Sequence, residues 1–347
     1  MSAAADVAPR ASTTLSAKSI NHYTFCIATI ERLCKANREL MNESEMDTAF
    51  PTLYFTNPEG IVGALMSAQP SYQLSSLISF MSSILWNMRT NVADCLGAEE
   101  PLNEFHVYPY IQHRDYLQAL LDTQTHERKG DLSSKEKKNY LSWPEVEKTY
   151  REKMVGVDVR GLKPSFDAVQ DFVIASLYVL QPPIRADYAN MRVFLSAEEV
   201  PADFRGNHFV LDPPMFVLYD YKNAKHRDAK RKPLVNPVGE ELRDIVADWL
   251  TVNPTEWLLV TRIGKSETCG FRPMTENGLS VRVRSIFKRW TGVAASINTL
   301  RHAFASHLRD TGASAEEKKA VATAMCHHPI TSEAYVRKPK TNASSCA

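Results

Sequence analysis

Apolar side chains recur every three or four residues through the first third of the chain, which is the spacing of one face of a helix. In residues 16–40 these positions are Ile20, Tyr23, Ile27, Ile30 and Leu33. Three more helices are predicted: one capped by Asn57 with Pro58 in its first turn, a broadly apolar one over YQLSSLISFMSSILWNM, and one that begins after Pro109. We expect an all-helical first domain over residues 16–128, preceded by a small, polar tail, residues 1–15, that is disordered.

A polar stretch, HERKGDLSSKEKKNYLS, then interrupts the apolar pattern. Its charge and lack of apolar residues predict a linker over residues 129–141. Ser142 and Glu145 have the S-x-x-E spacing of a capping box, which opens the next helix. The second domain therefore begins at residue 142 and extends to residue 347.

The second domain is predicted to be mostly helical with one strand-like part. MFVLYDY and KPLVNPV are rich in β-forming residues and flank a charged turn, a pattern typical of a hairpin. Helical patterns lie on both sides, in SFDAVQDFVIASLYVL, GEELRDIVADWLTV, NGLSVRVRSIFKRWTGV, TLRHAFASHLRDTG and SAEEKKAVATAM. The expected class is α+β, mostly helical, with a small antiparallel sheet.

Composition adds that the two halves differ in charge. The whole chain has 44% apolar and 23% charged residues and a net charge of +1, as in globular proteins with buried cores. Residues 1–141 hold 12 Lys+Arg against 16 Asp+Glu, whereas residues 142–347 hold 29 against 24. The basic excess therefore lies in the second half, and the acidic first half counts mildly against DNA binding.

The cysteines and the N-terminus indicate an intracellular protein. The six cysteines are scattered and form no C-x-x-C pair, which is typical of reduced thiols. The opening letters, MSAAADVAPRASTTLSAKS, lack the apolar core of a secretory signal. No stretch approaches the ~18 apolar residues that a membrane span requires.

Two basic features have ordinary explanations when each is taken alone. Arg185 follows the helix-breaking pair Pro182-Pro183, where it can simply pair with Asp187 at the surface. The run KNAKHRDAKRK holds six Lys/Arg and one Asp in eleven residues. That run fits a solvated turn, a nuclear-localisation-like patch or a hairpin that contacts phosphates.

The segment INTLRHAFASHLRDTG is predicted to be a helix capped by Asn298 and closed by Gly312. Arg301 and His302 would then lie in its first turn. A cation is disfavoured at this positive end of a helix, so its presence hints at an anionic partner.

The segment MCHHPITSEAY places two histidines ahead of a tyrosine near the end of the chain. Cys326, His327 and His328 are adjacent, so they cannot easily converge on one ion in a tetrahedral site. We expect no metal there.

Taken in order, these segments resemble the motifs of the tyrosine recombinases, also called phage-type integrases. The matching strings are IRADY, LYDYKNAK, NTLRHAFASHL and MCHHPITSEAY, of which LRHAFASHL is the most specific. SAKSINHYTFCIATIERLC resembles the first helix of the family's core-binding domain, and LSWPEVEKTY the opening of its catalytic domain. The resemblance spans residue 16 to the tyrosine and is nearest to integrases of eukaryotic mobile elements and large DNA viruses.

This resemblance implies a role for five residues. Tyr335 would attack a DNA phosphodiester and form a 3′-phosphotyrosyl link. Arg185 and Arg301 would bind the non-bridging oxygens, Lys222 would protonate the leaving 5′-oxygen, and His327 would hydrogen-bond the phosphate. Because the bond energy is kept in the phosphotyrosine, no ATP, metal or other cofactor is expected.

The resemblance also implies DNA contacts and an assembly. The expected partner is double-stranded DNA, bound by a homotetramer on two sites, with no membrane. The protein would then be found wherever its target DNA is, in the nucleus if the host is eukaryotic. The candidate DNA-binding residues are Asn298, Lys225, Arg227, Lys230 and Arg231.

The chain departs from the family at several places, among them the spacing of His327, which lies one residue closer to Tyr335 than in the common bacterial enzymes. Asn298 stands where the family has His or Lys, so it can hydrogen-bond a phosphate but cannot transfer a proton. The acidic position three residues after the first arginine is Tyr188, with Asp187 one position earlier.

Three activities remain open from the sequence. The first is a site-specific recombinase or integrase. The second is a type IB topoisomerase or a telomere-resolvase-like enzyme, which uses the same residue types. The third is a DNA-binding relic without catalysis, with Asn298 as the mark of decay.

Overall fold

The computed structural model describes residues 16–36, 58–90, 104–127, 132, 134–154, 165–222, 233–264, 270–326 and 336. The chain divides into two compact units, Met1–Lys129 and Gly130–Ala347. The predicted limits of the domains, at residues 128 and 142, stay predictions, and the predicted tail and Asn57 cap lie outside the described residues.

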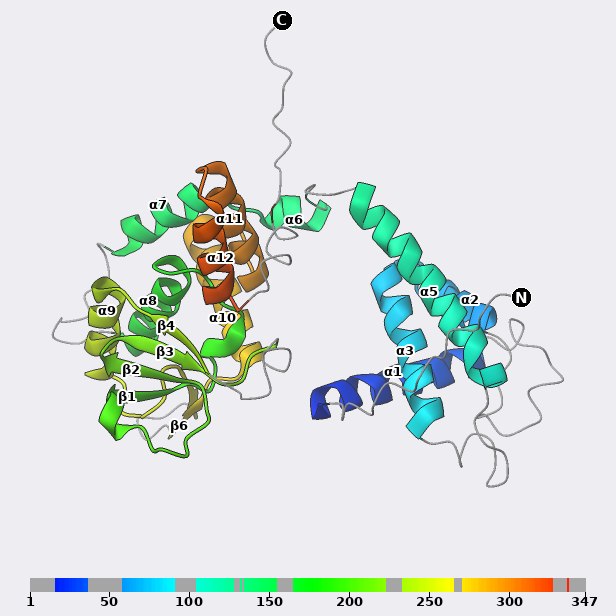
Figure 1. The fold of residues 1–347 in the computed structure, drawn as a ribbon, viewed down its shortest axis with the longest axis horizontal. Coiled ribbons are helices and arrows are strands. Elements are labelled where there is room, and N and C mark those ends of the chain that lie inside the picture. Colours follow the sequence, from blue (N-terminus) through cyan, green and yellow to red (C-terminus); the bar gives the residue numbers. More distant parts are fainter. Residues whose placement is uncertain are drawn as a thin grey trace, which may run out of the picture. The chain divides into compact units, whose positions relative to one another are not determined.

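The described part of the first unit is helical (Figure 1). Its helices are α1 (Ala17–Ala36), α2 (Pro58–Ala68), α3 (Leu74–Thr90) and α5 (Glu104–Glu127). Helix α3 packs against both α1 and α5, and its apolar face forms the core of the unit with side chains such as Ile30 and Tyr110.

The predicted start of the last helix, after Pro109, is wrong. Helix α5 begins at Glu104 and contains Pro109. A proline removes the hydrogen bond to the carbonyl four residues earlier, which here belongs to the first turn, so the rest of the helix continues undisturbed.

The second unit is mostly helical and holds a small mixed sheet (Figure 1). Its α-helices are α6 (Ser134–Asn139), α7 (Trp143–Met154), α8 (Phe166–Val179), α9 (Glu240–Leu250), α10 (Glu276–Thr291), α11 (Ile297–Asp310) and α12 (Ala315–Ala324). Helix α6 lies within the segment that we predicted to be a linker. A short, charged sequence can still form one or two helical turns. The described residues of this unit also form two short 3-10 turns, η4 (Ala186–Tyr188) and η5 (Ala197–Glu199).

The main sheet has the strand order β1-β2-β3-β4. The strands are β1 (Arg192–Ser196), β2 (His208–Asp212), β3 (Met215–Leu218) and β4 (Leu234–Pro237). The predicted hairpin is confirmed, since β3 and β4 are antiparallel with Leu218 opposite Leu234. The sheet as a whole is mixed and not antiparallel, because the segment between β1 and β2 returns the chain to the start of β1 and makes that pair parallel.

A second, two-stranded sheet pairs β5 (Val260–Ile263) with β6 (Gly270–Pro273). The sequence patterns predicted neither of these strands, nor β1. Each is only four or five residues long, and whether so short a segment forms a strand depends on the neighbours against which it packs.

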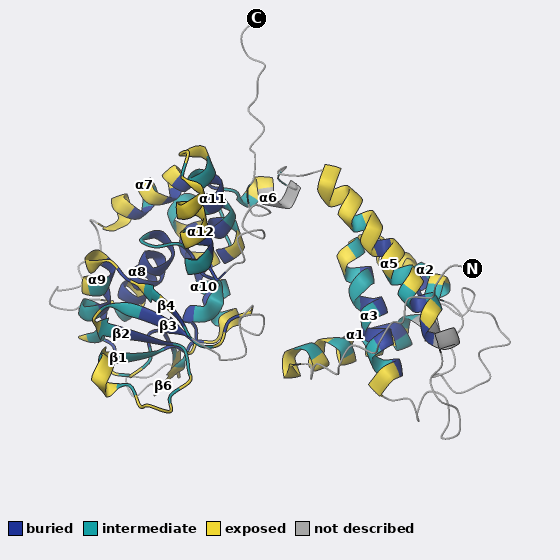
Figure 2. Ribbon diagram, viewed as in Figure 1, coloured by how far each residue is buried: buried dark blue, intermediate teal, exposed yellow. Residues whose placement is uncertain are grey.

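Helix α8 lies at the centre of the second core. All eleven residues from Val169 to Val179 are buried, and the helix packs against α7, α9 and α10 (Figure 2). A helix that is apolar on all sides is expected to be enclosed in this way. The end of α8, from which the Arg185 segment emerges, is therefore held from several sides.

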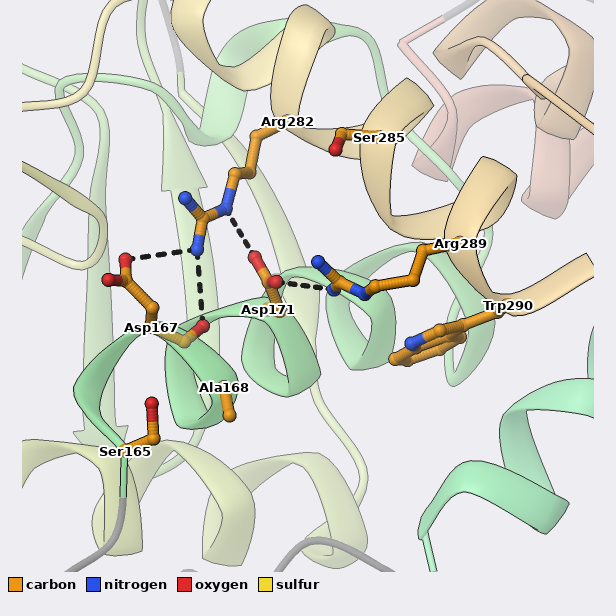
Figure 3. Close-up of a pocket in the computed structure, with 8 residues that line it drawn as sticks. All are labelled: Ser165, Asp167, Ala168, Asp171, Arg282, Ser285, Arg289 and Trp290. Atoms are coloured by element: carbon orange, nitrogen blue, oxygen red, sulfur yellow. Dashed lines mark hydrogen bonds and ion pairs between the residues drawn. The ribbon is translucent and has the colours of Figure 1, made fainter. Parts of the chain in front are cut away.

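An ion-pair cluster ties α10 to the first half of α8 (Figure 3). The Asp171 carboxylate, whose side chain is 6% exposed, accepts hydrogen bonds from Arg282 Nε and from Arg289 Nη2, the latter at 2.5 Å. Arg282 Nη2 also donates to Asp167 Oδ1 at 3.0 Å. These residues line an open hollow of about 490 Å³ beside Trp290.

Replacing Asp171 should destabilise the second unit. The substitution Asp171→Asn leaves two arginines without their shared counter-charge, and we expect a loss of about 2 kcal/mol, below the value for a fully buried pair because both arginines reach solvent. Urea unfolding followed by tryptophan fluorescence measures the change.

The matched control is Asp244→Asn, which breaks the exposed pair of Asp244 with Arg243 on α9. Its urea midpoint should equal that of the unchanged chain. Equal midpoints for both variants would contradict the structural role of Asp171.

Candidate active site

Arg185 lies in the turn that follows α8. The helix ends at Leu180, and Pro182 and Pro183 prevent its continuation because proline lacks the N–H that a helix requires. Arg185 is half-buried and immediately precedes η4. The Tyr178 hydroxyl donates a hydrogen bond to the Arg185 backbone carbonyl at 2.9 Å.

Arg301 is fully buried on α11, with 0% exposure. Its Nη1 donates to the Pro183 carbonyl at 2.8 Å, two residues before Arg185. Its Nη2 donates to the Met325 carbonyl at 3.3 Å, just beyond the end of α12. One guanidinium group thus joins the Arg185 turn to the segment that leads towards His327.

Asp187 connects the two arginines electrostatically. Burial raises the pKa of its carboxyl group above the ordinary value, while the positive charges of Arg185 and Arg301 oppose that shift and the charge of Glu276 adds to it. The hydrogen bond from Arg301 Nη1 to the Pro183 carbonyl places Arg301 against the turn that carries both Arg185 and Asp187. The sequence indicated only a surface pair of Asp187 with Arg185, because no local pattern shows that a distant helix supplies a second arginine.

The start of α11 differs from the prediction. Ser296 is the N-cap, and its hydroxyl accepts a hydrogen bond from the Thr299 amide at 3.1 Å. Asn298 is the exposed second residue of the helix and not its cap, and Arg301 lies in the second turn. The unfavourable effect of the helix dipole that we predicted for Arg301 does not apply, because that effect is confined to the first turn of a helix. Gly312 closes the helix with φ +74°, as predicted.

Lys222 is exposed and follows the end of β3 by four residues. The exit from β3 is held by Asn207, whose Oδ1 accepts from the amides of Tyr219 and Asp220, each at 2.9 Å. Lys222, Arg185 and Arg301 all carry positive charge and donate hydrogen bonds only, and the place of Lys222 at the site of the two arginines stays a prediction.

The other predicted site residues lie outside the described residues: Tyr335, His327, Lys225, Arg227, Lys230 and Arg231. The described chain before His327 ends at Cys326, which is buried and has φ 59°. The carbonyl of the preceding residue, Met325, accepts the hydrogen bond from Arg301 Nη2. The described chain thus contacts Arg301 two residues before His327.

Neither metal clusters nor membrane spans are found in the described part of the chain. No three His, Cys, Asp or Glu side chains there are grouped as metal ligands. None of the described helices is long and apolar enough to cross a membrane.

Comparisons with known proteins give matches among solved structures alone. No protein-family model matches the chain, and no curated protein matches it. Among solved structures, the chain is similar to the crystal structure of XerA recombinase at 13% sequence identity, over 94% of this chain and 89% of that chain, with a TM-score of 0.37. That score is too low to support an argument about fold or function.

The raised pKa of Asp187 predicts a pH-dependent stability. Between the ordinary pKa of about 4 and the raised value, the folded chain binds a proton that the unfolded chain has released, so stability falls as pH rises through this window. The variant Asp187→Asn lacks this loss and should gain stability relative to the unchanged chain across the window. Thermal midpoints of both proteins over a pH series measure the difference, and a difference that is constant with pH would contradict the prediction.

Proposed function

We propose that the chain is a tyrosine recombinase that breaks and rejoins DNA at specific sites through a covalent 3′-phosphotyrosine. The observation that carries the proposal is that Arg301, 116 positions after Arg185 in the sequence, donates a hydrogen bond to the Pro183 carbonyl in the turn that carries Arg185. Two guanidinium groups at one site match the two non-bridging oxygens of a phosphodiester.

The environment of this site suits charge stabilisation. Negative charge develops on the non-bridging oxygens as phosphorus becomes pentacoordinate. A buried or half-buried guanidinium group stabilises such a charge more than an exposed one, because the local dielectric constant is low. Arg301 is also held by two carbonyls, so little reorganisation is needed before the reaction.

The proposed reaction is a transesterification without an external energy source. The Tyr335 phenol releases its proton to solvent as its oxygen attacks phosphorus. The bond from phosphorus to the 5′-oxygen breaks, the released 5′-oxygen takes a proton from Lys222, and solvent returns a proton to the lysine. His327 donates a hydrogen bond to the phosphate. The reverse attack by a 5′-hydroxyl restores the DNA and frees the tyrosine, so neither metal nor ATP takes part.

The proposal includes contacts with the DNA around the cleaved bond. The basic run from Lys222 to Lys232, which includes Lys225, Arg227, Lys230 and Arg231, would contact backbone phosphates. Asn298 is exposed on the α11 turn before Arg301 and would donate a hydrogen bond to a phosphate oxygen. The helical domain at residues 16–128 would clamp the duplex, and four copies would assemble on two sites.

The variant Tyr335→Phe should abolish covalent protein–DNA adducts, because it lacks the attacking oxygen. The assay uses a nicked duplex from which the short cleaved strand diffuses away, which traps the adduct, and gel shifts measure binding separately. Binding should be unchanged. The control Tyr116→Phe alters an exposed tyrosine of α5 and should form adducts at the normal rate.

Each other outcome of this assay has a definite meaning. Adducts formed by Tyr335→Phe would refute the assigned nucleophile. Specific binding without adducts in the unchanged chain would indicate a DNA-binding relic. Relaxation of any supercoiled plasmid, without a specific site, would favour a topoisomerase over a recombinase.

A further inference from the structure

The turn between α8 and η4 is closed by buried tyrosines. Tyr178 is fully buried, and its hydroxyl donates to the Arg185 carbonyl at 2.9 Å. The Tyr188 hydroxyl donates to the Leu177 carbonyl at 3.1 Å and accepts a hydrogen bond from Gln181 Nε2. The two phenols therefore close the turn from opposite ends.

Aromatic packing fixes these tyrosines to the sheet. The Tyr178 ring meets Tyr188 edge-on, with centroids 5.3 Å apart, and Tyr188 meets Phe216 of β3 in the same way at 5.2 Å. Such edge-to-face pairs restrict ring rotation. The Tyr178 hydroxyl thus has a fixed position relative to the sheet.

We propose that Tyr178 is a positioning residue for Arg185, an inference that rests on the proposed function. The carbonyl that receives the Tyr178 hydroxyl belongs to the same residue as the guanidinium group, so the hydrogen bond fixes the backbone from which that side chain extends. The bond from Arg301 Nη1 to Pro183 holds the same turn from another element. Together the two bonds set the spacing of the two arginines.

Loss of the Tyr178 hydroxyl should slow the chemical step and leave DNA affinity unchanged. Affinity comes from many phosphate contacts, whereas stabilisation of the transition state depends on the placement of two guanidinium groups. A displacement of about 1 Å in a catalytic group can reduce a rate by about 100-fold.

The core offers a matched control in Tyr150. This tyrosine of α7 is also fully buried, and its hydroxyl shares a hydrogen bond of 2.8 Å with Ser176 Oγ of α8. Tyr150→Phe therefore removes the same group from the same core, but from a contact between two helices that does not involve Arg185. A purely structural role for Tyr178 predicts equal effects of the two substitutions.

The experiment compares single-turnover adduct formation by Tyr178→Phe, Tyr150→Phe and the unchanged chain at saturating nicked duplex. Affinity for the duplex and the urea midpoint are measured in parallel. We expect the two variants to lose similar stability and to retain affinity, while only Tyr178→Phe loses at least about tenfold in rate. 4-Aminophenylalanine at position 178 restores a donor and should recover most of the rate.

The outcomes separate this inference from the proposed function. Equal rates for Tyr178→Phe and Tyr150→Phe would overturn the inference alone, as would a failure of 4-aminophenylalanine to restore the rate. If Tyr178→Phe does not fold, the test is the rate of adduct formation by the variant with 4-aminophenylalanine at position 178, compared with that of the unchanged chain. A variant that folds but reacts slowly would contradict the positioning of Arg185 by a hydrogen-bond donor. Absence of adducts from the unchanged chain would overturn the proposed function, and the inference with it.

Discussion

The candidate site depends on the hydrogen bonds that the buried guanidinium group of Arg301 donates to two backbone carbonyls. Burial of a full charge is costly unless the group is hydrogen-bonded, and Arg301 meets this demand with the carbonyls of Pro183 and Met325. Those carbonyls belong to the turn after α8 and to the end of α12. One side chain thus fixes two segments that are far apart in the sequence, and it holds the backbone that carries Arg185.

A rigid support surrounds this interaction. Helix α8 is buried along almost its whole length, and the Asp171 cluster ties it to α10. The turn after α8 is closed by phenol hydroxyls and anchored to β3 by aromatic contacts. Functional groups keep their geometry best on packed elements of this kind, since their own rotamers and backbone are fixed by neighbours.

The electrostatics of the site work against stability. Asp187 is held where burial raises the pKa of its carboxyl group, so its ionised form is less favourable than at the surface. The same burial strengthens the fields of Arg185 and Arg301. The carboxyl group of Asp187 compensates part of the positive charge of the two arginines.

The sequence by itself determined most of the described helices of both units and the hairpin of β3 and β4. These features follow from local periodicity and short-range hydrogen bonds, which the order of neighbouring residues encodes. It also singled out Arg185 and Arg301 through their motifs, while the roles of Tyr335 and His327 stay predictions. Only the tertiary structure decided the parallel pairing of β1 with β2, the choice of Ser296 over Asn298 as cap, and the hydrogen bond from Arg301 to the turn that carries Arg185. Pairing and burial depend on contacts between distant segments, and a cap depends on where the packed helix begins, so no local pattern specifies them.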